Sequence, residues 1–537
     1  MDLAKTLLVT LALAFPAKAG ESPFKNLGEI ARSVGFDGEV RAAVSRKVKI
    51  AILDNGFKGH ADEIGKSLPA STVFHAGPVA VASENEESHG FFMAQLVSGL
   101  LDTAGVSYDL HLYSAFGYSN LDAAVKAVVN EKFDVVLYSQ VWEYGGNGDG
   151  AGFINRLVSQ ATSSGITWVN AAGNFGSGTY QAPIQAAEDN WVKLPGANNG
   201  VRVRCLESSR KKCGLRIVMS WNDFKDDVSE GTDKDLDLVL TDDSLKILRS
   251  SSLAQKKSFP ENEPGSSLYP REIIQYEVDP GLYFIRAKMR SQNFDPSRDR
   301  LRMTVSGDFV QLLDTTPSET VLTPADNAGV ITVGATDSEK SGASRSRGKP
   351  ELVAPSKVVL QNGETYKGSS NSAAIAAAAV ALMKAVKPDL SRERILELLA
   401  RETTADSQYD LNTFGFEPTG PGCFYLSRLP QVPPAAQWYL GNGGVVVETT
   451  RGLKILTPFD PLASVTGLEK KRPEEILAAG QSLEILPRSR QGALPGGAVE
   501  VLQFPRGQAV CDRNGNRPPS LPRVKAALRL PRASEIR

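Results

Sequence analysis

The feature that most constrains this chain is a regular alternation of short apolar runs with longer helical stretches over residues 48–176. Parallel strands need a long crossover connection, and an amphipathic helix usually supplies it. The pattern therefore predicts an α/β fold, a parallel sheet with helices on both faces. The expected strands are Val48–Leu53, Leu110–Tyr113, Val135–Tyr138 and Ile166–Val169, and the expected helices are Phe91–Leu101, Leu121–Asn130 and Gly152–Ser164.

The texture changes between residues 191 and 317, where short strand-like runs are separated by turn residues and no helical pattern stands out. Such a pattern is typical of an antiparallel β-sandwich. Strand and helix then alternate again from Val330–Gly334 through Ala373–Val386 and Arg392–Glu402. We therefore predict a discontinuous α/β domain (48–190 and 318–428) that carries an inserted β-sandwich domain (191–317). A small, mainly-β C-terminal region with a basic tail is expected over 429–537.

The N-terminus has the pattern of an export signal. Lys5 precedes the apolar run Thr6–Phe15, and Ala17-Lys18-Ala19 is a small-x-small cleavage site. We predict a signal peptide over residues 1–19, a short N-terminal segment over 20–47, and export to the periplasm or the medium. An apolar run of about ten residues is too short to span a bilayer, so no transmembrane segment is expected.

The charges of the 537 residues nearly cancel, since 60 basic side chains face 61 acidic ones for a net charge of −1. This balance gives no reason to expect nucleic acid as a partner, and we expect a monomer. Export would permit disulfides. The four cysteines allow three connectivities. We favour the nearest-neighbour pairing, in which Cys205–Cys213 closes a short hairpin and Cys423–Cys511 ties down the C-terminal region.

Four local motifs each follow a predicted strand or open a predicted helix, where sites gather in parallel sheets. Each motif also has a purely structural interpretation: a turn for the Asp and Asn motifs, a capping or surface role for the His, and a helix N-cap for the Ser. Together they supply what serine hydrolysis needs, namely a nucleophile, a base, an orienting carboxylate and an oxyanion donor. The motifs are Asp54-Asn55-Gly56, His89-Gly90, Ala171-Ala172-Gly173-Asn174 and Gly368-Ser369-Ser370-Asn371-Ser372-Ala373.

In this order the motifs resemble those of the subtilases, the subtilisin-like serine peptidases, over residues 48–185 and 320–418. The resemblance implies a secreted serine endopeptidase that acts on protein or peptide substrates and needs no cofactor for catalysis. It assigns Ser370 as nucleophile, His89 as general base and Asp54 as the carboxylate that orients the base. Asn174 and the Ser370 backbone N–H would then bind the oxyanion.

The sequence also departs from the family pattern. The substrate-cleft strand usually reads Ser-Leu-Gly, and here it reads Ser139-Gln140-Val141. The second His of the His motif is missing, as are the Met and Pro near Ser370. Val141 is expected to narrow the primary specificity pocket. These departures keep a second hypothesis open, in which the chain is a catalytically inactive secreted binding or scaffold protein on the same fold.

An acidic run in the predicted insertion carries four aspartates that could bind Ca²⁺, namely Asp223, Asp233, Asp235 and Asp237. Asp235 and Asp237 alternate onto one face of a predicted strand. Calcium takes six to eight oxygen ligands, and paired carboxylates suit it. The hypotheses of a structural calcium site and of a solvated acidic loop are both open at this point.

Overall fold

In the computed structural model the described residues are 22–36, 46–81, 87–206, 212–258, 264–316, 319–338, 340–344 and 346–400, together with short strands and Leu530 beyond them. The chain divides into two compact units. Unit 1 comprises Met1–Glu402 and Ala526–Arg537, and unit 2 comprises Thr403–Lys525. The predicted signal peptide, residues 1–19, lies outside the described residues.

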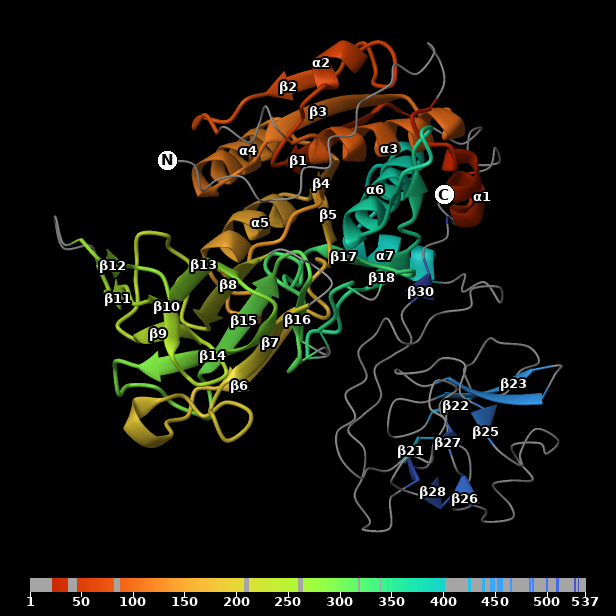
Figure 1. Ribbon diagram of the computed structural model, residues 1–537. Coiled ribbons are helices and arrows are strands. Elements are labelled where there is room, and N and C mark those ends of the chain that lie inside the picture. The colour runs from red at the N-terminus through yellow and green to blue at the C-terminus, as the bar shows by residue number, and fades with distance from the viewer. Residues whose placement is uncertain are drawn as a thin grey trace. The chain divides into compact units, whose positions relative to one another are not determined.

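Unit 1 is built around an eight-stranded sheet in which all neighbouring strands are parallel (Figure 1). This confirms the predicted α/β class. From β1 the chain adds strands first on one side and then, with β4, on the other, and such a reversal is where open parallel sheets bind ligands. The order is β2 (Val73–His75), β3 (Tyr108–Ser114), β1 (Val48–Asp54), β4 (Val135–Tyr138), β5 (Thr167–Ala171), β17 (Ile331–Ala335), β18 (Leu352–Ala354) and β30 (Ala526–Ala527).

Both faces of the sheet are covered by helices, because alternate side chains of each strand point to opposite sides. Ile50 and Ile52 of β1 belong to one apolar core, and Ala51 and Leu53 belong to another. The helices that contribute to the first core are α1 (Leu27–Val34), α3 (His89–Ala104), α6 (Ser369–Val386) and α7 (Arg392–Ala400). Those that contribute to the second are α4 (Tyr118–Asn130) and α5 (Phe153–Ser163). A one-turn helix, α2 (His60–Glu63), follows β1.

Helix α6 is long and apolar enough to cross a membrane by length and composition. Every one of its 18 residues is nevertheless buried inside the protein. Its many alanines let it pack closely against α3 and the strands of the sheet. We therefore interpret α6 as the central core helix of unit 1.

Two antiparallel sheets follow β5 and enclose a separate apolar core. Strand β6 already belongs to them, so the sandwich begins before the predicted boundary at residue 191. One sheet has the order β10 (Ile247–Ser251), β9 (Leu236–Thr241), β14 (Gly281–Met289), β7 (Val201–Cys205) and β16 (Val310–Leu312). The other has the order β13 (Arg271–Val278), β8 (Cys213–Trp221), β15 (Arg300–Ser306) and β6 (Thr179–Pro183). This part also contains a small ladder of β11 (Ala254–Gln255) with β12 (Ser266–Ser267) and a 3₁₀ turn, η3 (Glu188–Asn190). A second small ladder, β19 (Val358–Val359) with β20 (Thr365–Tyr366), lies between β18 and α6.

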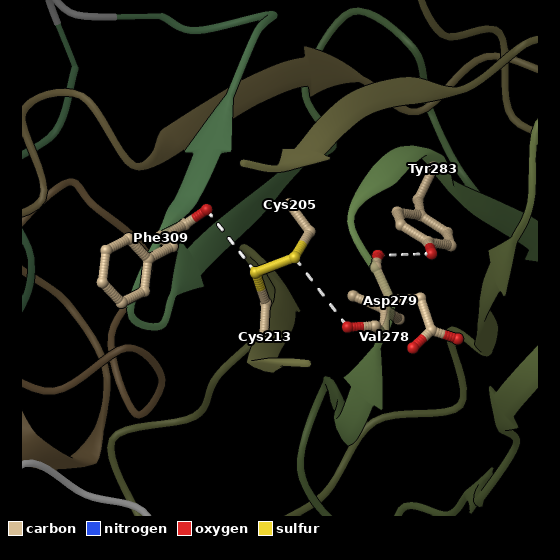
Figure 2. Close-up of a disulfide and its surroundings, with 6 residues drawn as sticks. All are labelled: Cys205, Cys213, Val278, Asp279, Tyr283 and Phe309. Atoms are coloured by element: carbon tan, nitrogen blue, oxygen red, sulfur yellow. Dashed lines mark hydrogen bonds between the residues drawn. A yellow bond between two sulfur atoms is a disulfide. The ribbon is translucent and has the colours of Figure 1, made fainter. Parts of the chain in front are cut away.

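The disulfide Cys205–Cys213 forms as predicted, but it closes no hairpin (Figure 2). Cys205 ends β7 in the five-stranded sheet, and Cys213 begins β8 in the four-stranded sheet. The bridge therefore joins the two sheets of the sandwich at one end. Sequence separation suggested a hairpin because the cysteines are eight positions apart, whereas the two strands that they join belong to different sheets.

Unit 2 contains short antiparallel pairings, which fits the expected mainly-β region. Cys423 and Cys511 lie outside the described residues, so their predicted disulfide stays a prediction. The pairings are β21 (Phe424–Tyr425) with β29 (Ala509–Val510), β22 (Gln437–Tyr439) with β23 (Val445–Thr449) and β24 (Gly452–Leu456), β25 (Ser464–Val465) with β27 (Ile485–Leu486), and β26 (Ser482–Leu483) with β28 (Val499–Glu500).

Candidate active site

The carboxylate of Asp54 and the imidazole of His89 form a directly hydrogen-bonded pair. Asp54 is the last residue of β1 and is fully buried, while His89 is the first residue of α3. His89 Nδ1 lies 3.0 Å from each of the two Asp54 carboxylate oxygens. The backbone N–H of Asn55 donates a further bond of 2.8 Å to Asp54 Oδ1. An Nδ1–H that donates to a carboxylate leaves the other imidazole nitrogen, Nε2, free to accept a proton.

The glycines of both motifs are required by close approach. A Cβ atom on Gly90 would lie 2.5 Å from the Asp54 Cβ, and one on Gly56 would lie 2.5 Å from the carbonyl oxygen of Glu87. The Gly90 N–H also donates to the Gly56 carbonyl at 2.9 Å. The start of α3 can thus press against the end of β1 only because neither position carries a side chain. The glycines of the Asp-x-Gly and His-Gly motifs therefore serve the same contact, in which the start of α3 packs against the end of β1.

The pKa of His89 is raised above its ordinary value. Desolvation by itself would lower this pKa, but the Asp54 carboxylate, through its charge and its hydrogen bond, and the charge of Glu87 outweigh it. The side chain of His89 is still 37% exposed, whereas that of Asp54 is fully buried. The pair therefore combines a buried acid with a base that solvent or a substrate can reach.

Ser370 lies in the first turn of α6 and is 9% exposed. Its hydroxyl donates a 3.2 Å hydrogen bond to the carbonyl oxygen of Ser139, just after β4. Among the described residues, no hydrogen bond joins Ser370 to His89. The next two side chains are also held at this end of α6: Asn371 donates to Ser356 O at 2.7 Å and Ser372 to Ala354 O at 2.9 Å.

Asn174 lies beside the start of the same helix. Its Oδ1 accepts hydrogen bonds from the backbone N–H of Ser369 at 3.0 Å and from the Ser369 hydroxyl at 3.2 Å. The Oδ1 atom is occupied in this way, whereas the amide nitrogen lies beside Gly368, where an added Cβ would be 3.2 Å from it. The residue as a whole is exposed. A side-chain N–H, a helix N-terminus and a serine hydroxyl thus lie at one place, which suits an oxyanion.

The segment Ser139–Val141 brings the separate groups together. Ser139 accepts from Ser370, and the side-chain amide of Gln140 lies 3.0 Å from Asp54 Oδ1 and 3.2 Å from His89 Nδ1. Val141 packs over Gly173, where an added Cβ would lie 3.1 Å from a Val141 methyl group. Three consecutive residues thus contact all parts of the site. Ser139 contacts Ser370, Gln140 contacts Asp54 and His89, and Val141 contacts the oxyanion loop at Gly173. The sequence placed Gln140 in the substrate-cleft strand, whose backbone was expected to form one wall of the cleft, and this stays a prediction. The contact of the Gln140 side chain with the Asp54–His89 pair was not predicted.

The other three histidines lie away from this site. His75 Nε2 is 2.9 Å from His111 Nδ1 across β2 and β3, and burial lowers the pKa of both. The Nδ1 atom of His60 contacts the Phe57 carbonyl at 2.7 Å. His89 is thus the histidine that the described structure brings to the predicted site.

Three of the four aspartates of the predicted calcium site have side-chain partners, whereas Oδ1 of the fourth, Asp235, is buried without a hydrogen bond. Asp223 contacts Lys225 and Thr232, Asp233 contacts Lys257, and Asp237 pairs with Arg290. Asp235 precedes β9, and burial together with the Asp237 charge raises its pKa to about 6. Within the described ranges, no three His, Cys, Asp or Glu side chains gather in a way that could hold a metal ion. Calcium binding stays a prediction, which isothermal titration of the full chain would test.

Known proteins resemble this chain over parts of its length. The model of the subtilase family matches residues 289–416, which include Ser370. Alkaline elastase YaB from Bacillus sp. (strain YaB) is 26% identical over 181 residues, which are 32% of this chain and 43% of that protein. The chain thus spans less than half the length of this relative.

Three solved peptidase structures match this chain at low identity. The Clostridium perfringens CspB protease is 15% identical, with a TM-score of 0.43 over 72% of this chain and 94% of that one. The nisin leader peptidase NisP from Lactococcus lactis is 13% identical, with a TM-score of 0.33 over 72% and 91%. MycP1 without its propeptide is 14% identical, with a TM-score of 0.30 over 71% and 92%.

Proposed function

We propose that this chain, which matches the subtilase family over residues 289–416, is a secreted serine endopeptidase that hydrolyses peptide bonds of protein substrates through an acyl-enzyme on Ser370. The observation that carries the proposal is the Asp54–His89 pair, with Nδ1 at 3.0 Å from the carboxylate and Ser370 bound to the same short segment. A buried carboxylate that holds an imidazole by Nδ1 is the arrangement a serine nucleophile needs.

The proposed reaction begins when Ser370 Oγ attacks the substrate carbonyl carbon and His89 Nε2 takes the hydroxyl proton. The carbonyl oxygen becomes an oxyanion, which the Asn174 amide and the Ser370 N–H stabilise. The C–N bond then breaks as His89 returns the proton to the leaving amine. Water, deprotonated by His89, then attacks the ester carbon. The bond from that carbon to Ser370 Oγ breaks, and His89 returns the proton to Oγ as the acid product leaves. Asp54 keeps its charge throughout and stabilises the imidazolium.

One observation favours the alternative of an inactive binding or scaffold protein: the Ser370 hydroxyl donates to Ser139 and not to His89. We weigh it as the weaker argument, because rotation about the Cα–Cβ bond of Ser370 redirects the hydroxyl. Hydrogen bonds of catalytic groups also often form only once substrate is bound.

The proposal is tested with a fluorophosphonate probe, which reacts covalently with an activated serine. We expect the full chain to be labelled and Ser370→Ala to take no label. Ser372→Ala is the matched control, because Ser372 lies in the same helical turn and bonds to Ala354 O. If the folded parent protein takes no label and cleaves no casein, the peptidase proposal fails and the scaffold hypothesis replaces it.

A further inference from the structure

The Asp54–His89 pair has a third member, the side chain of Gln140. Its Nε2 lies 3.0 Å from Asp54 Oδ1 and 3.2 Å from His89 Nδ1. Asp54 is fully buried, so each hydrogen bond to its carboxylate acts in a medium of low dielectric constant. Gln140 is one of the positions at which the sequence departs from the family pattern, where leucine is usual.

The two carboxylate oxygens of Asp54 accept different numbers of hydrogen bonds. Oδ1 can accept from the Asn55 N–H, at 2.8 Å, and from Gln140. A carboxylate oxygen has about two acceptor sites, so these two donors fill it. The proton on His89 Nδ1, which is 3.0 Å from both oxygens, is then left with Oδ2. This sharing fixes the plane and the tautomer of the imidazole.

The backbone of Gln140 is held in place by a hydrogen bond to a buried residue of the sheet. Its backbone carbonyl accepts a 3.0 Å hydrogen bond from the side chain of Asn170 in β5. Asn170 is fully buried and accepts in turn from the indole N–H of Trp168 at 3.0 Å. This chain of bonds connects the interior of the sheet to the amide that contacts Asp54, so the position of Gln140 is determined by buried structure.

Building on the proposed peptidase function, we propose that Gln140 is a positioning residue that occupies Asp54 Oδ1 and so directs the Nδ1 proton of His89 to Oδ2. The amide N–H also places a positive dipole end beside both Asp54 and Nδ1. It therefore stabilises the carboxylate and disfavours the imidazolium. Gln140 thereby keeps His89 unprotonated at lower pH than the carboxylate alone would allow.

The charged groups that act on this pair are few. Asp54 and Glu87 act on His89, and both raise its pKa. Tyr138 of β4 lies near Asp54, and burial raises the pKa of its phenol well above the usual range, so it stays neutral. A change in the His89 pKa of a Gln140 variant can therefore be attributed to the lost amide dipole or to altered pairing with Asp54.

The test compares the full chain with Gln140→Met, which keeps the length of the side chain but removes its donor, and with Gln140→Glu, which replaces the donor by a second carboxylate. We expect Gln140→Met to lower kcat about tenfold with KM little changed, and to move the acid limb of the kcat/KM profile up by about half to one pH unit. Gln140→Glu should move it further in the same direction, because a negative charge favours the imidazolium. Gln95→Met is the control, since it removes a buried amide bond to Ser67 elsewhere along α3.

A second measurement keeps this inference separate from the peptidase proposal. The His89 pKa is measured by NMR on the full chain, with the resonance assigned by its loss in His89→Gln. A raised pKa in Gln140→Met supports the positioning role even if the protein takes no fluorophosphonate label. An unchanged His89 pKa in folded Gln140→Met and Gln140→Glu overturns it, and a loss of thermal stability alone would mark Gln140 as merely structural.

Discussion

The parallel-sheet region and the antiparallel insertion both bury aspartates, but they neutralise them differently. In the insertion, Asp299 is 5% exposed and pairs with Lys234 Nζ at 2.7 Å, and Asp237 is equally buried and pairs with Arg290. In the parallel-sheet region, Asp54 is fully buried and its basic partner is His89. Within the described residues, no lysine or arginine pairs with Asp54.

The difference matters because lysine and arginine stay charged near neutral pH, whereas an imidazole gains and loses a proton there. An aspartate paired with a permanent cation can only hold structure. Glu272 of the insertion shows a third case: it accepts from neutral donors, and burial raises its pKa to about 6. At the candidate active site a buried carboxylate holds a partner that titrates near neutral pH, which is the combination that proton transfer through an imidazole requires.

The largest effect is expected from removing the titratable partner. His89→Ala should lower kcat/KM by about 10⁶, as should Ser370→Ala, because residues that act as one unit fail together. The double variant should be no worse than either single one. Kinetics on a peptide ester substrate, with circular dichroism as the folding control, check this. Additive losses would show that the two residues do not act as a unit.

An Asp-to-Asn substitution in each region tests whether the two buried aspartates have different roles. Asp54→Asn should lower kcat by about 10⁴, because the amide favours the wrong imidazole tautomer. Asp237→Asn should leave kcat/KM of the folded protein unchanged but reduce the free energy of unfolding by about 1–2 kcal/mol, because Arg290 loses its ion pair. Urea unfolding and initial-rate kinetics on both variants provide the measurement. A comparable loss of kcat in Asp237→Asn would contradict the distinction.

An intermediate effect is expected at the oxyanion loop. Asn174→Ala removes the side-chain donor and should lower kcat by about 10²–10³ with KM little changed, since the donor acts on charge that develops in the transition state. Loss of the Oδ1 bonds to Ser369 should also loosen the start of α6. Asn174→Asp, which keeps an acceptor but removes the donor, separates the two roles: it should restore thermal stability and leave kcat low.

The smallest effect is expected in the insertion. Burial and Asp237 raise the pKa of Asp235 from 3.8 to about 6, so the folded state binds the proton more tightly than the unfolded state. Stability should therefore rise as pH falls from about 6 towards 4. Asp235→Asn should raise the free energy of unfolding at pH 7 by about 1–2 kcal/mol and flatten this pH dependence. Thermal melts between pH 4 and 7 measure it, and a destabilised variant at pH 7 would show that the carboxylate is needed.

Much of the fold was predictable because strand and helix periodicity is local. The runs Val48–Leu53 and Val135–Tyr138 correspond to β1 and β4 almost residue for residue. The Cys205–Cys213 bond was predicted too, but its place between two sheets was not, because strand pairing joins residues far apart in sequence. The start of the sandwich at β6 was missed for the same reason.

At the candidate site, the sequence by itself determined which residue types carry the chemistry and in what order, because Asp54-Asn55-Gly56, His89-Gly90 and the Ser370 motif are local patterns. It also determined that glycine stands where α3 meets β1. Only the tertiary structure decided that Gln140 turns to Asp54 and that the aspartates near β9 take lysine and arginine partners. The physical reason is that a motif records the needs of neighbours along the chain, whereas the partner of a buried charge is chosen by whichever distant segment packs against it.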